Sequence, residues 1–426
     1  RTPPFPAAAV NKATHYMSLW RGKDALSGEA GSDYRRIDLD RIAGRKSPPV
    51  DLSLTPEEAG FDYRDLRFPV GAPVLGSVRC DSSWNNRDAG ICWIGLLAGG
   101  AASASEVSGA SGAVYVTDMT DGRIVGVPMR TEGMAYAPPS AYTFRNDNVL
   151  EGFFLGTSEG VIHRGVFDGS LPRATSLEKV FVLELPGKDG VLRRVGVPFA
   201  LEVTLRNDED IWLFGGTRDV PAASGTLDND GQCFFAVNTG GASSFPIRTA
   251  ELAALDPDAT AFSSNNAGWY IPLYRSATTE EYVTDMPKIA GGVLFVSTFT
   301  PDPNVSAANC SVTGSSRIFI VDAFSGKGLW NAAGKKSLRL DGVKVTGVQV
   351  ASTQTAEGEK HQVYLGVTNL EKKPFSDPAL QGLNLQENPG VLVFDVPEEA
   401  RKVMDANRRY VPGVPVIQYW RDVFNR

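Results

Sequence analysis

The sequence predicts an all-β fold, a β-propeller of about seven four-stranded blades with few short helices. Three observations favour it: 44 Gly and 27 Pro are spread along all 426 residues, short apolar strands recur, and many of them end at an Asp or Asn followed by a glycine turn. Glycine supplies the positive φ that tight turns need, and proline prevents a strand from continuing. The 42% hydrophobic content is enough to bury a sizeable core.

Residues 1–62 are predicted to form an irregular arm or inter-domain segment ahead of a propeller over residues 63–426. The segment is rich in proline and charge, and its one clear helix signal is Thr55–Glu58. There a threonine N-cap precedes proline and two acids in the first turn. The chain begins at Arg1 without Met, so we interpret it as a processed or excised product.

Two strand types alternate along the rest of the chain. The first closes in Asp or Asn and a glycine turn, as in Val114–Gly122, Ile318–Gly326, Phe234–Gly240 and Val391–Asp395. The second carries glycine near its end, as in Phe153–Gly156, Trp212–Gly216 and Val363–Gly366. At about 45–50 residues per blade, the span holds about seven blades. Two separate β-sandwiches are the alternative, which we favour less because no Pro-rich or polar linker divides the repeats.

Helical signals in the repeat region are confined to residues 249–255 and 397–406, which fit insertions between strands. The net charge of −7 and the absence of a basic stripe argue against nucleic-acid binding. No apolar run approaches the roughly 20 residues that span a bilayer, so no membrane span is predicted.

The four cysteines suggest disulfides. Cys80 and Cys92 flank a polar turn segment and are predicted to join two adjacent strands. Closing so short a loop contributes on the order of 3 kcal/mol. Cys233 and Cys310 are a second candidate pair, and four buried free thiols are the alternative. The lack of a CxxC pair argues against a zinc ribbon, and a disulfide would imply an oxidising compartment.

One long stretch resembles a known family. A Gly-Trp-Tyr strand at Gly268–Leu273, a Pro-led strand from Pro287 to Pro301, the loop residue Cys310 and the strand Ile318–Gly326 follow in order. This pattern resembles the PilC/PilY family of type IV pilus assembly factors and tip adhesins, in its C-terminal domain. Further stretches resemble the same family in the same order, at Trp93–Gly100, Phe154–Ile162, Phe214–Arg218 and Tyr419–Phe424.

The resemblance covers about residues 70–426 and implies a function. It implies an exported, extracellular propeller on the pilus or outer cell surface, which takes part in fimbrium biogenesis, in cell adhesion, or in both. Pilus or filament subunits and a host or abiotic surface ligand are the implied partners. An adhesin, an assembly factor and a pure scaffold for filament subunits all remain open.

Calcium is the cofactor that the resemblance suggests. The family typically places a calcium loop, acidic at alternate positions, before one aromatic-x-Gly strand, and alignment puts it at Thr143–Glu151. Asp147 and Glu151 keep acids there, whereas Arg145 would repel the cation, which takes six to eight oxygens. A solvated blade loop is therefore the alternative. Asp228 and Asp230 are a second pair of metal candidates, although such Asp-Gly clusters also form turns.

Enzymatic motifs are incomplete, so we expect no catalysis. Gly156–Gly160 matches the GxSxG expression of a nucleophile elbow, but the residues after it predict a strand rather than a helix, which favours a hairpin turn. Gly334–Ser337 lacks the phosphate-loop spacing and is interpreted as a basic surface turn. Quinoprotein dehydrogenases share the repeat at Val321–Trp330 but carry adjacent cysteines. A periplasmic quinoprotein-like or hydrolytic enzyme on the same repeat remains the alternative.

Overall fold

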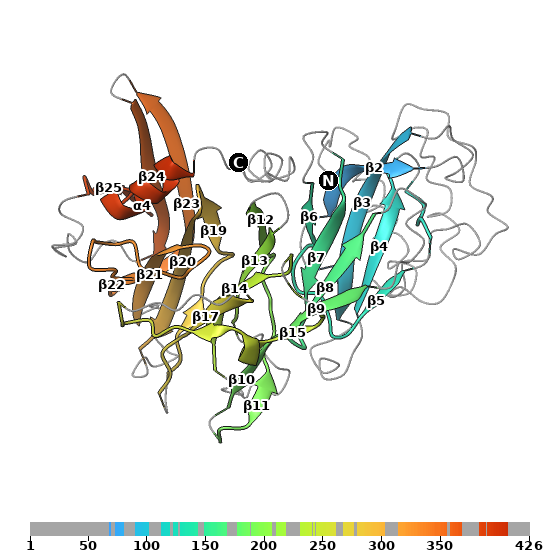
Figure 1. Ribbon diagram of the computed structural model, residues 1–426, viewed down its shortest axis with the longest axis horizontal. Coiled ribbons are helices and arrows are strands. Elements are labelled where there is room, and N and C mark those ends of the chain that lie inside the picture. The colour runs from blue at the N-terminus through green and yellow to red at the C-terminus, as the bar shows by residue number, and fades with distance from the viewer. Residues whose placement is uncertain are drawn as a thin grey trace, which may run out of the picture. The chain divides into compact units, whose positions relative to one another are not determined.

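The computed structural model describes residues 68–69, 73–80, 90–101, 112–119, 122–126, 128–143, 149–167, 177–187, 189–206, 210–218, 231–240, 242, 244–260, 267–276, 279–302, 314–355, 358–368, 383–388 and 390–407 (Figure 1). The predicted arm at residues 1–62 lies outside these ranges. The chain divides into two compact units: unit 1 is Arg1–Leu155, Arg164–Glu178 and Val414–Arg426, and unit 2 is Gly156–His163 and Lys179–Gly413. A single propeller over residues 63–426 stays a prediction.

The described residues form an all-β structure with one α-helix, as predicted. That helix is α4 (Glu398–Ala406), which begins with two acids in its first turn and matches the expected helix at 397–406. The other expected helix is shorter than predicted, because the 3-10 helix η4 (Thr249–Glu251) passes directly into strand β16 (Ala253–Ala254). None of the helices described here combines the length and hydropathy of a membrane span.

Unit 1 contains a sheet of five strands, in which the order is β1-β3-β4-β5 and β2 also pairs with β3. The strands are β1 (Phe68–Pro69), β2 (Val74–Cys80), β3 (Gly90–Ala101), β4 (Gly112–Asp118) and β5 (Met129–Thr131). Strand β4 is buried along its whole length. Its apolar residues Val114 and Val116 join a core with Ile94, Leu96 and Phe153.

A second sheet has the order β15-β9-β8-β7-β6 and contains the residues at which the chain passes from one unit to the other. Its strands are β6 (Ser140–Tyr142), β7 (Gly152–Gly156), β8 (Val161–Val166), β9 (Glu178–Val182) and β15 (Ile247–Arg248). The short strand β15 pairs parallel to β9, from a position more than sixty residues further along the chain. A two-stranded sheet, β10 (Glu184–Pro186) with β11 (Leu192–Arg194), follows β9.

Three further sheets build most of unit 2. The first, called the β13 sheet, has the order β12-β13-β14-β17-β16, with β12 (Glu202–Arg206), β13 (Asp210–Gly216), β14 (Cys233–Asn238) and β17 (Gly268–Pro272). The β20 sheet has the order β18-β20-β21-β22, with β19 also paired to β20. Its strands are β18 (Tyr282–Val283), β19 (Lys288–Ala290), β20 (Val293–Pro301), β21 (Gly314–Asp322) and β22 (Ser337–Asp341). The β24 sheet has the order β23-β24-β26-β25, with β23 (Lys344–Thr355), β24 (Gly358–Thr368), β25 (Gln386–Asn388) and β26 (Val391–Asp395).

These sheets pack face to face. Phe234 on β14 and Phe319 on β21 place their ring centroids 4.9 Å apart in the core between the β13 and β20 sheets. On the other face of the β20 sheet, Phe295 joins Phe394 of the β24 sheet in a second core. Strand β14 is buried throughout because both of its faces are covered. Phe319 covers the face that carries Phe234, and Phe181 covers the face that carries Phe235, with the ring centroids of Phe181 and Phe235 5.3 Å apart.

The predicted repeat is present as a repeated hydrogen-bond pattern. In the first copy, the N–H of Gly122 donates to the carbonyl of Asp118 at 2.8 Å, and the N–H of Asp118 donates to the carbonyl five residues on at 2.8 Å. The second copy repeats both bonds with the same lengths at Gly326 and Asp322. The glycines have φ of 82° and 69°, which a side-chain-bearing residue adopts only with strain. The blade number of about seven stays a prediction, and the sheets formed by the described strands are all open.

Candidate functional site

The predicted disulfide between Cys80 and Cys92 is confirmed. It joins β2 to β3, with the two Cα atoms 5.9 Å apart. In the register of these strands Cys80 lies opposite Gly90 and Cys92 lies opposite Val78, so the bridge is diagonal across the pair. Both sulfur-bearing side chains are buried in the unit 1 core.

Cys233 is a free, buried thiol, so the structure does not place it in a disulfide. The residue begins β14, and its N–H donates to the Thr217 hydroxyl at 2.8 Å while that hydroxyl donates back to the Cys233 carbonyl at 3.1 Å. Burial raises the pKa of the thiol far above its ordinary value. Its candidate partner Cys310 lies outside the described residues.

Among the predicted metal candidates, Asp147, Asp228 and Asp230 lie outside the described residues, and Glu151 lies inside them. The main-chain N–H of Glu151, just before β7, donates to the Tyr142 carbonyl at 3.0 Å. Burial raises the pKa of Tyr142 to about 12, against the opposing charge of Arg164, so its hydroxyl stays protonated at neutral pH.

The described part of this loop does not by itself make a calcium site. It offers the Glu151 carboxylate and the buried Thr143 hydroxyl, and these supply fewer oxygens than the six to eight that calcium takes. The described residues also contain no group of three or more His, Cys, Asp or Glu placed to hold a metal ion. Calcium binding therefore stays a prediction from the resemblance.

The Gly156–Gly160 motif is a hairpin turn between β7 and β8, as expected. The N–H of Gly160 donates to the Thr157 carbonyl at 3.2 Å, and the N–H of Thr157 donates to the Val161 carbonyl at 3.1 Å. Gly160 has φ of 67°, and the chain continues as a strand. A nucleophile elbow leads into a helix instead, so this motif is a turn and not an elbow.

The two ends of the stretch that resembles the pilus family meet where the β13 sheet contacts the β20 sheet. The indole N–H of Trp269, on β17, donates to the Ala323 carbonyl at 3.1 Å, within the Asp322–Gly326 turn. The Asp322 carboxylate holds that turn by accepting from the N–H of Ser325 at 2.8 Å and from its hydroxyl at 2.7 Å. A Cβ at Gly326 would lie 2.2 Å from Leu255 and 3.1 Å from the Trp269 ring, so glycine is required for this approach.

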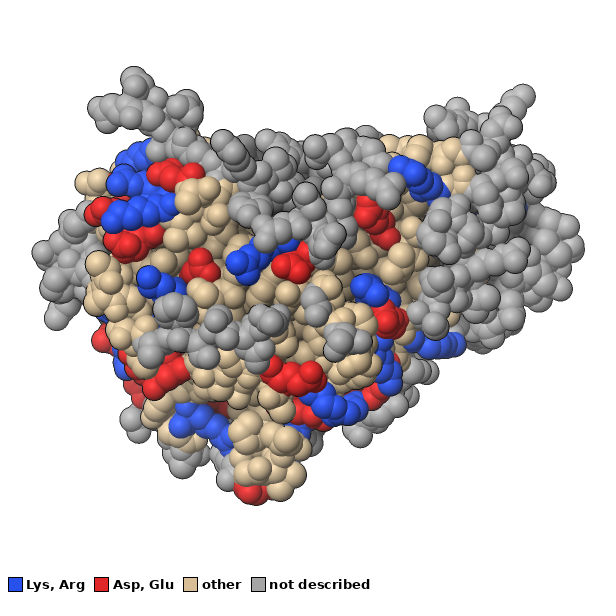
Figure 2. Space-filling view, viewed as in Figure 1, with Lys and Arg blue, Asp and Glu red and all other residues tan. Residues whose placement is uncertain are grey.

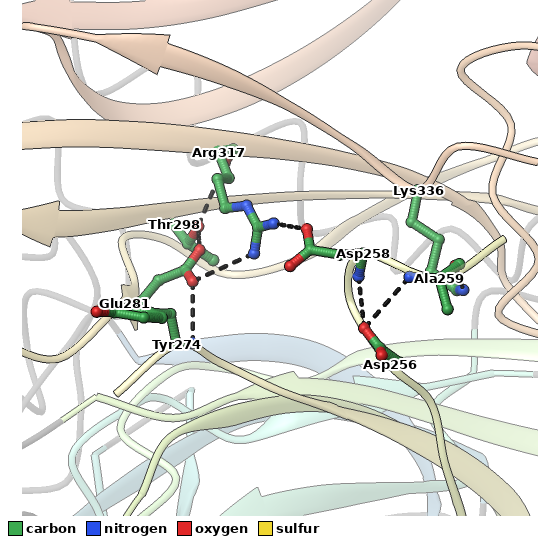
Figure 3. Close-up of polar contacts among 8 residues, drawn as sticks. All are labelled: Asp256, Asp258, Ala259, Tyr274, Glu281, Thr298, Arg317 and Lys336. Atoms are coloured by element: carbon green, nitrogen blue, oxygen red, sulfur yellow. Dashed lines mark hydrogen bonds and ion pairs between the residues drawn. The ribbon is translucent and has the colours of Figure 1, made fainter. Parts of the chain in front are cut away.

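A polar network, called the Glu281 cluster, links the same two sheets, with Glu281, Thr298 and Lys336 buried and with Asp256 and Asp258 exposed (Figure 3). Its members are Asp256, Asp258, Ala259, Tyr274, Glu281, Thr298, Arg317 and Lys336. The Glu281 side chain is fully buried, and its Oε1 accepts a short hydrogen bond from the Thr298 hydroxyl. Its Oε2 accepts from the Tyr274 N–H at 3.1 Å and pairs with the Arg317 guanidinium at 3.5 Å.

The other end of the cluster holds the loop that follows β16. Asp256 Oδ1 accepts from the N–H groups of Asp258 at 2.8 Å and Ala259 at 3.2 Å, and these bonds lower the pKa of the Asp256 carboxyl. Arg317 pairs with Asp258, and the Lys336 ammonium donates to the Ala259 carbonyl. Lys336 is buried, so the interpretation of residues 334–337 as a surface turn is wrong for this side chain. The physical reason is that its ammonium donates to the Ala259 carbonyl of the loop that follows β16.

The Glu281 cluster fastens the loop of the β13 sheet to the β20 sheet. Burial lowers the pKa of Lys336, while the nearby Asp256 and Asp258 favour its charged form. Both oxygens of Glu281 are bonded, to Thr298, Tyr274 and Arg317, so its carboxylate has a structural role. Sequence inspection missed this cluster because its members come from positions up to eighty residues apart.

No family model matches the sequence, and no curated protein matches it. Solved structures do. The chain resembles the C-terminal domain of PilY1 from Pseudomonas aeruginosa, at 13% identity over 71% of each chain, with a TM-score of 0.49. It is also similar to BamB from Moraxella catarrhalis, at 11% identity over 71% of this chain and 81% of that one, with a TM-score of 0.25. A further similarity is to BBS1N, solved in complex with ARL6DN, at 12% identity over 77% and 81% of the two chains, with a TM-score of 0.27. The first of these belongs to the family that the sequence motifs resemble.

Proposed function

We propose that this chain is an exported β-propeller of the type IV pilus, which acts in pilus biogenesis or surface adhesion and catalyses no reaction. The observation that carries the proposal is the Trp269 contact. The two ends of the family-like stretch, 54 residues apart, meet in one hydrogen bond from Trp269 to Ala323. Two residues of the stretch that carries the resemblance thus connect two sheets, as expected if that stretch determines the architecture.

The propeller part of the proposal is supported by the strand order. In the β13 and β24 sheets, antiparallel strands follow each other mainly in chain order, and in unit 2 three such sheets stack through apolar cores. Antiparallel sheets of about four strands form the blades of a propeller where they are arranged radially. The matched turns at Asp118 and Asp322 support a repeated blade.

The exported location is supported by the Cys80–Cys92 disulfide, because disulfides persist in oxidising compartments. The non-catalytic part of the proposal is supported by the one nucleophile-elbow candidate and by the buried Glu281 carboxylate. The Gly156–Gly160 motif is a hairpin turn, and the buried Glu281 carboxylate is fully engaged by Thr298, Tyr274 and Arg317.

The proposal is tested in the bacterium that carries this gene. We expect a deletion strain to lose surface pili, attachment to surfaces, or both, and a plasmid copy to restore them. Sheared pili from the wild-type strain should contain the protein when probed with antibody. A Trp269→Ala copy should fail to complement, whereas an exposed-surface control, Arg339→Gln, should complement fully. Normal pili and normal attachment in the deletion strain would overturn the proposal.

A further inference from the structure

Two cations and two aromatic rings form a continuous group in unit 2, called the Arg218–Lys344 cluster. Arg218 follows β13, Tyr282 is on β18, Phe299 is on β20, and Lys344 begins β23. The Arg218 guanidinium lies 5.1 Å from the Tyr282 ring centroid, and the Lys344 ammonium lies 5.3 Å from the Phe299 centroid. The rings meet edge to face with their centroids 6.0 Å apart. Three sheets therefore contribute to one cationic and aromatic group.

Neither cation is neutralised by the residues that the structure describes. Arg164, Arg248 and Arg317 each pair with a carboxylate, but Arg218 and Lys344 have no ion pair to a described acid. Arg218 is exposed and Lys344 is half-buried. Partial burial and the charge of Arg218 both lower the pKa of Lys344, which shows that the two charges repel each other. An anion placed between them would relieve this repulsion.

The presence of two cations, one over each ring, favours an anionic partner that carries more than one acidic group. The two cations lie over different rings of the pair, Arg218 over Tyr282 and Lys344 over Phe299. In an extended peptide, alternate side chains are about 6.5–7 Å apart and point the same way. Two acidic side chains on one face of such a segment would allow each carboxylate to pair with one of the two cations. The Tyr282 hydroxyl is an additional donor, since burial raises its pKa.

We propose that the Arg218–Lys344 cluster binds an extended acidic segment of a partner protein. This inference does not depend on the pilus role, because it rests on contacts within unit 2. On the face shown in Figure 2, acidic and basic side chains of the described residues are interspersed and do not gather by sign.

The test uses the whole chain and a fluorescently labelled hexaglutamate peptide, with fluorescence anisotropy at low ionic strength. We expect binding that weakens in high salt, as screened charge pairs do. Arg218→Gln combined with Lys344→Gln should weaken it at least about tenfold, or about 1.4 kcal/mol. Arg206→Gln is the matched control, because Arg206 also lies 5.1 Å from an aromatic ring, that of Phe324, and has no described carboxylate partner. It should change binding by less than about twofold.

Three results would overturn the proposal: no binding of hexaglutamate, equal loss in the control and the double variant, or binding of a sulfated heparin oligosaccharide in place of the peptide. Arg218→Lys keeps the charge and should retain binding within about threefold. Melting curves of each variant separate loss of the site from loss of folding. If the double variant does not fold, the single variant Arg218→Gln decides, and a loss no larger than that of Arg206→Gln counts against the proposal.

Discussion

Removal of Arg317 should destabilise the protein because it leaves the Glu281 carboxylate buried without its counter-charge. The Glu281 side chain is 0% exposed and that of Arg317 is 16% exposed. Breaking a buried ion pair by removing one partner costs about 3–5 kcal/mol. The Thr298 hydroxyl and the Tyr274 N–H still bond the carboxylate, and Arg317 is partly solvated, so we expect about 2–3 kcal/mol for Arg317→Leu.

Glu281→Leu removes the buried charge instead but leaves two donors without an acceptor. Each unsatisfied buried donor costs about 1–3 kcal/mol, so we expect about 2–6 kcal/mol in total. The double variant should lose less than the sum of the two, with a coupling energy of about 1–3 kcal/mol. Urea denaturation followed by tryptophan fluorescence measures all three free energies of unfolding.

The matched control is the exposed pair of Arg339 and Asp341, whose side chains are 66% and 77% exposed. Arg339→Leu should change the free energy of unfolding by less than about 0.5 kcal/mol, since exposed pairs contribute little. Two results would refute this reasoning: a change in stability for Arg317→Leu no larger than that of the control, or effects of the two substitutions that simply add. Either result would mean that the ion pair of Glu281 and Arg317 does not stabilise the contact between the two sheets.

Three more predictions concern pH, thiols and calcium. Burial raises the pKa of Glu202 to about 7, because the neutral acid is favoured in the folded state, although Lys288 opposes the shift. The stability that this acid contributes is therefore present at low pH and lost as pH rises from about 4.5 to 7. Across this range the melting temperature of Glu202→Gln should depend less on pH than that of the unsubstituted protein. The same pH dependence in both proteins would contradict the assignment. Peptide mapping after alkylation without reductant should find Cys80, Cys92 and Cys233 unmodified in the folded protein, and Cys233 alone among these three modified in urea; modification of Cys80 would exclude the bridge. Elemental mass spectrometry with melting curves in chelator tests calcium: one bound calcium and a lower melting temperature without it would support the predicted loop, and an unchanged melt would count against it.

Local features were predictable from the sequence. The turns at Asp118–Gly122, Gly156–Gly160 and Asp322–Gly326 are closed by main-chain bonds between residues at most five apart, and the glycines have the positive φ expected of them. The Cys80–Cys92 bridge spans a sequence separation of 12 and joins neighbouring strands of one hairpin. Such contacts depend on the residues beside them in the chain, so composition and spacing are sufficient to find them.

The pairing of distant side chains was decided by the tertiary structure. The Glu281 cluster, the bond from Trp269 to Ala323 and the Arg218–Lys344 cluster each join residues that lie on different sheets. The sequence indicated Lys336 as a surface residue and Cys233 as a candidate for a disulfide, and the structure buries both. The physical reason is that strand pattern determines which face of a sheet is apolar, whereas the stacking of complete sheets determines which polar groups meet between them. A buried charge is stable only where that stacking brings it a partner.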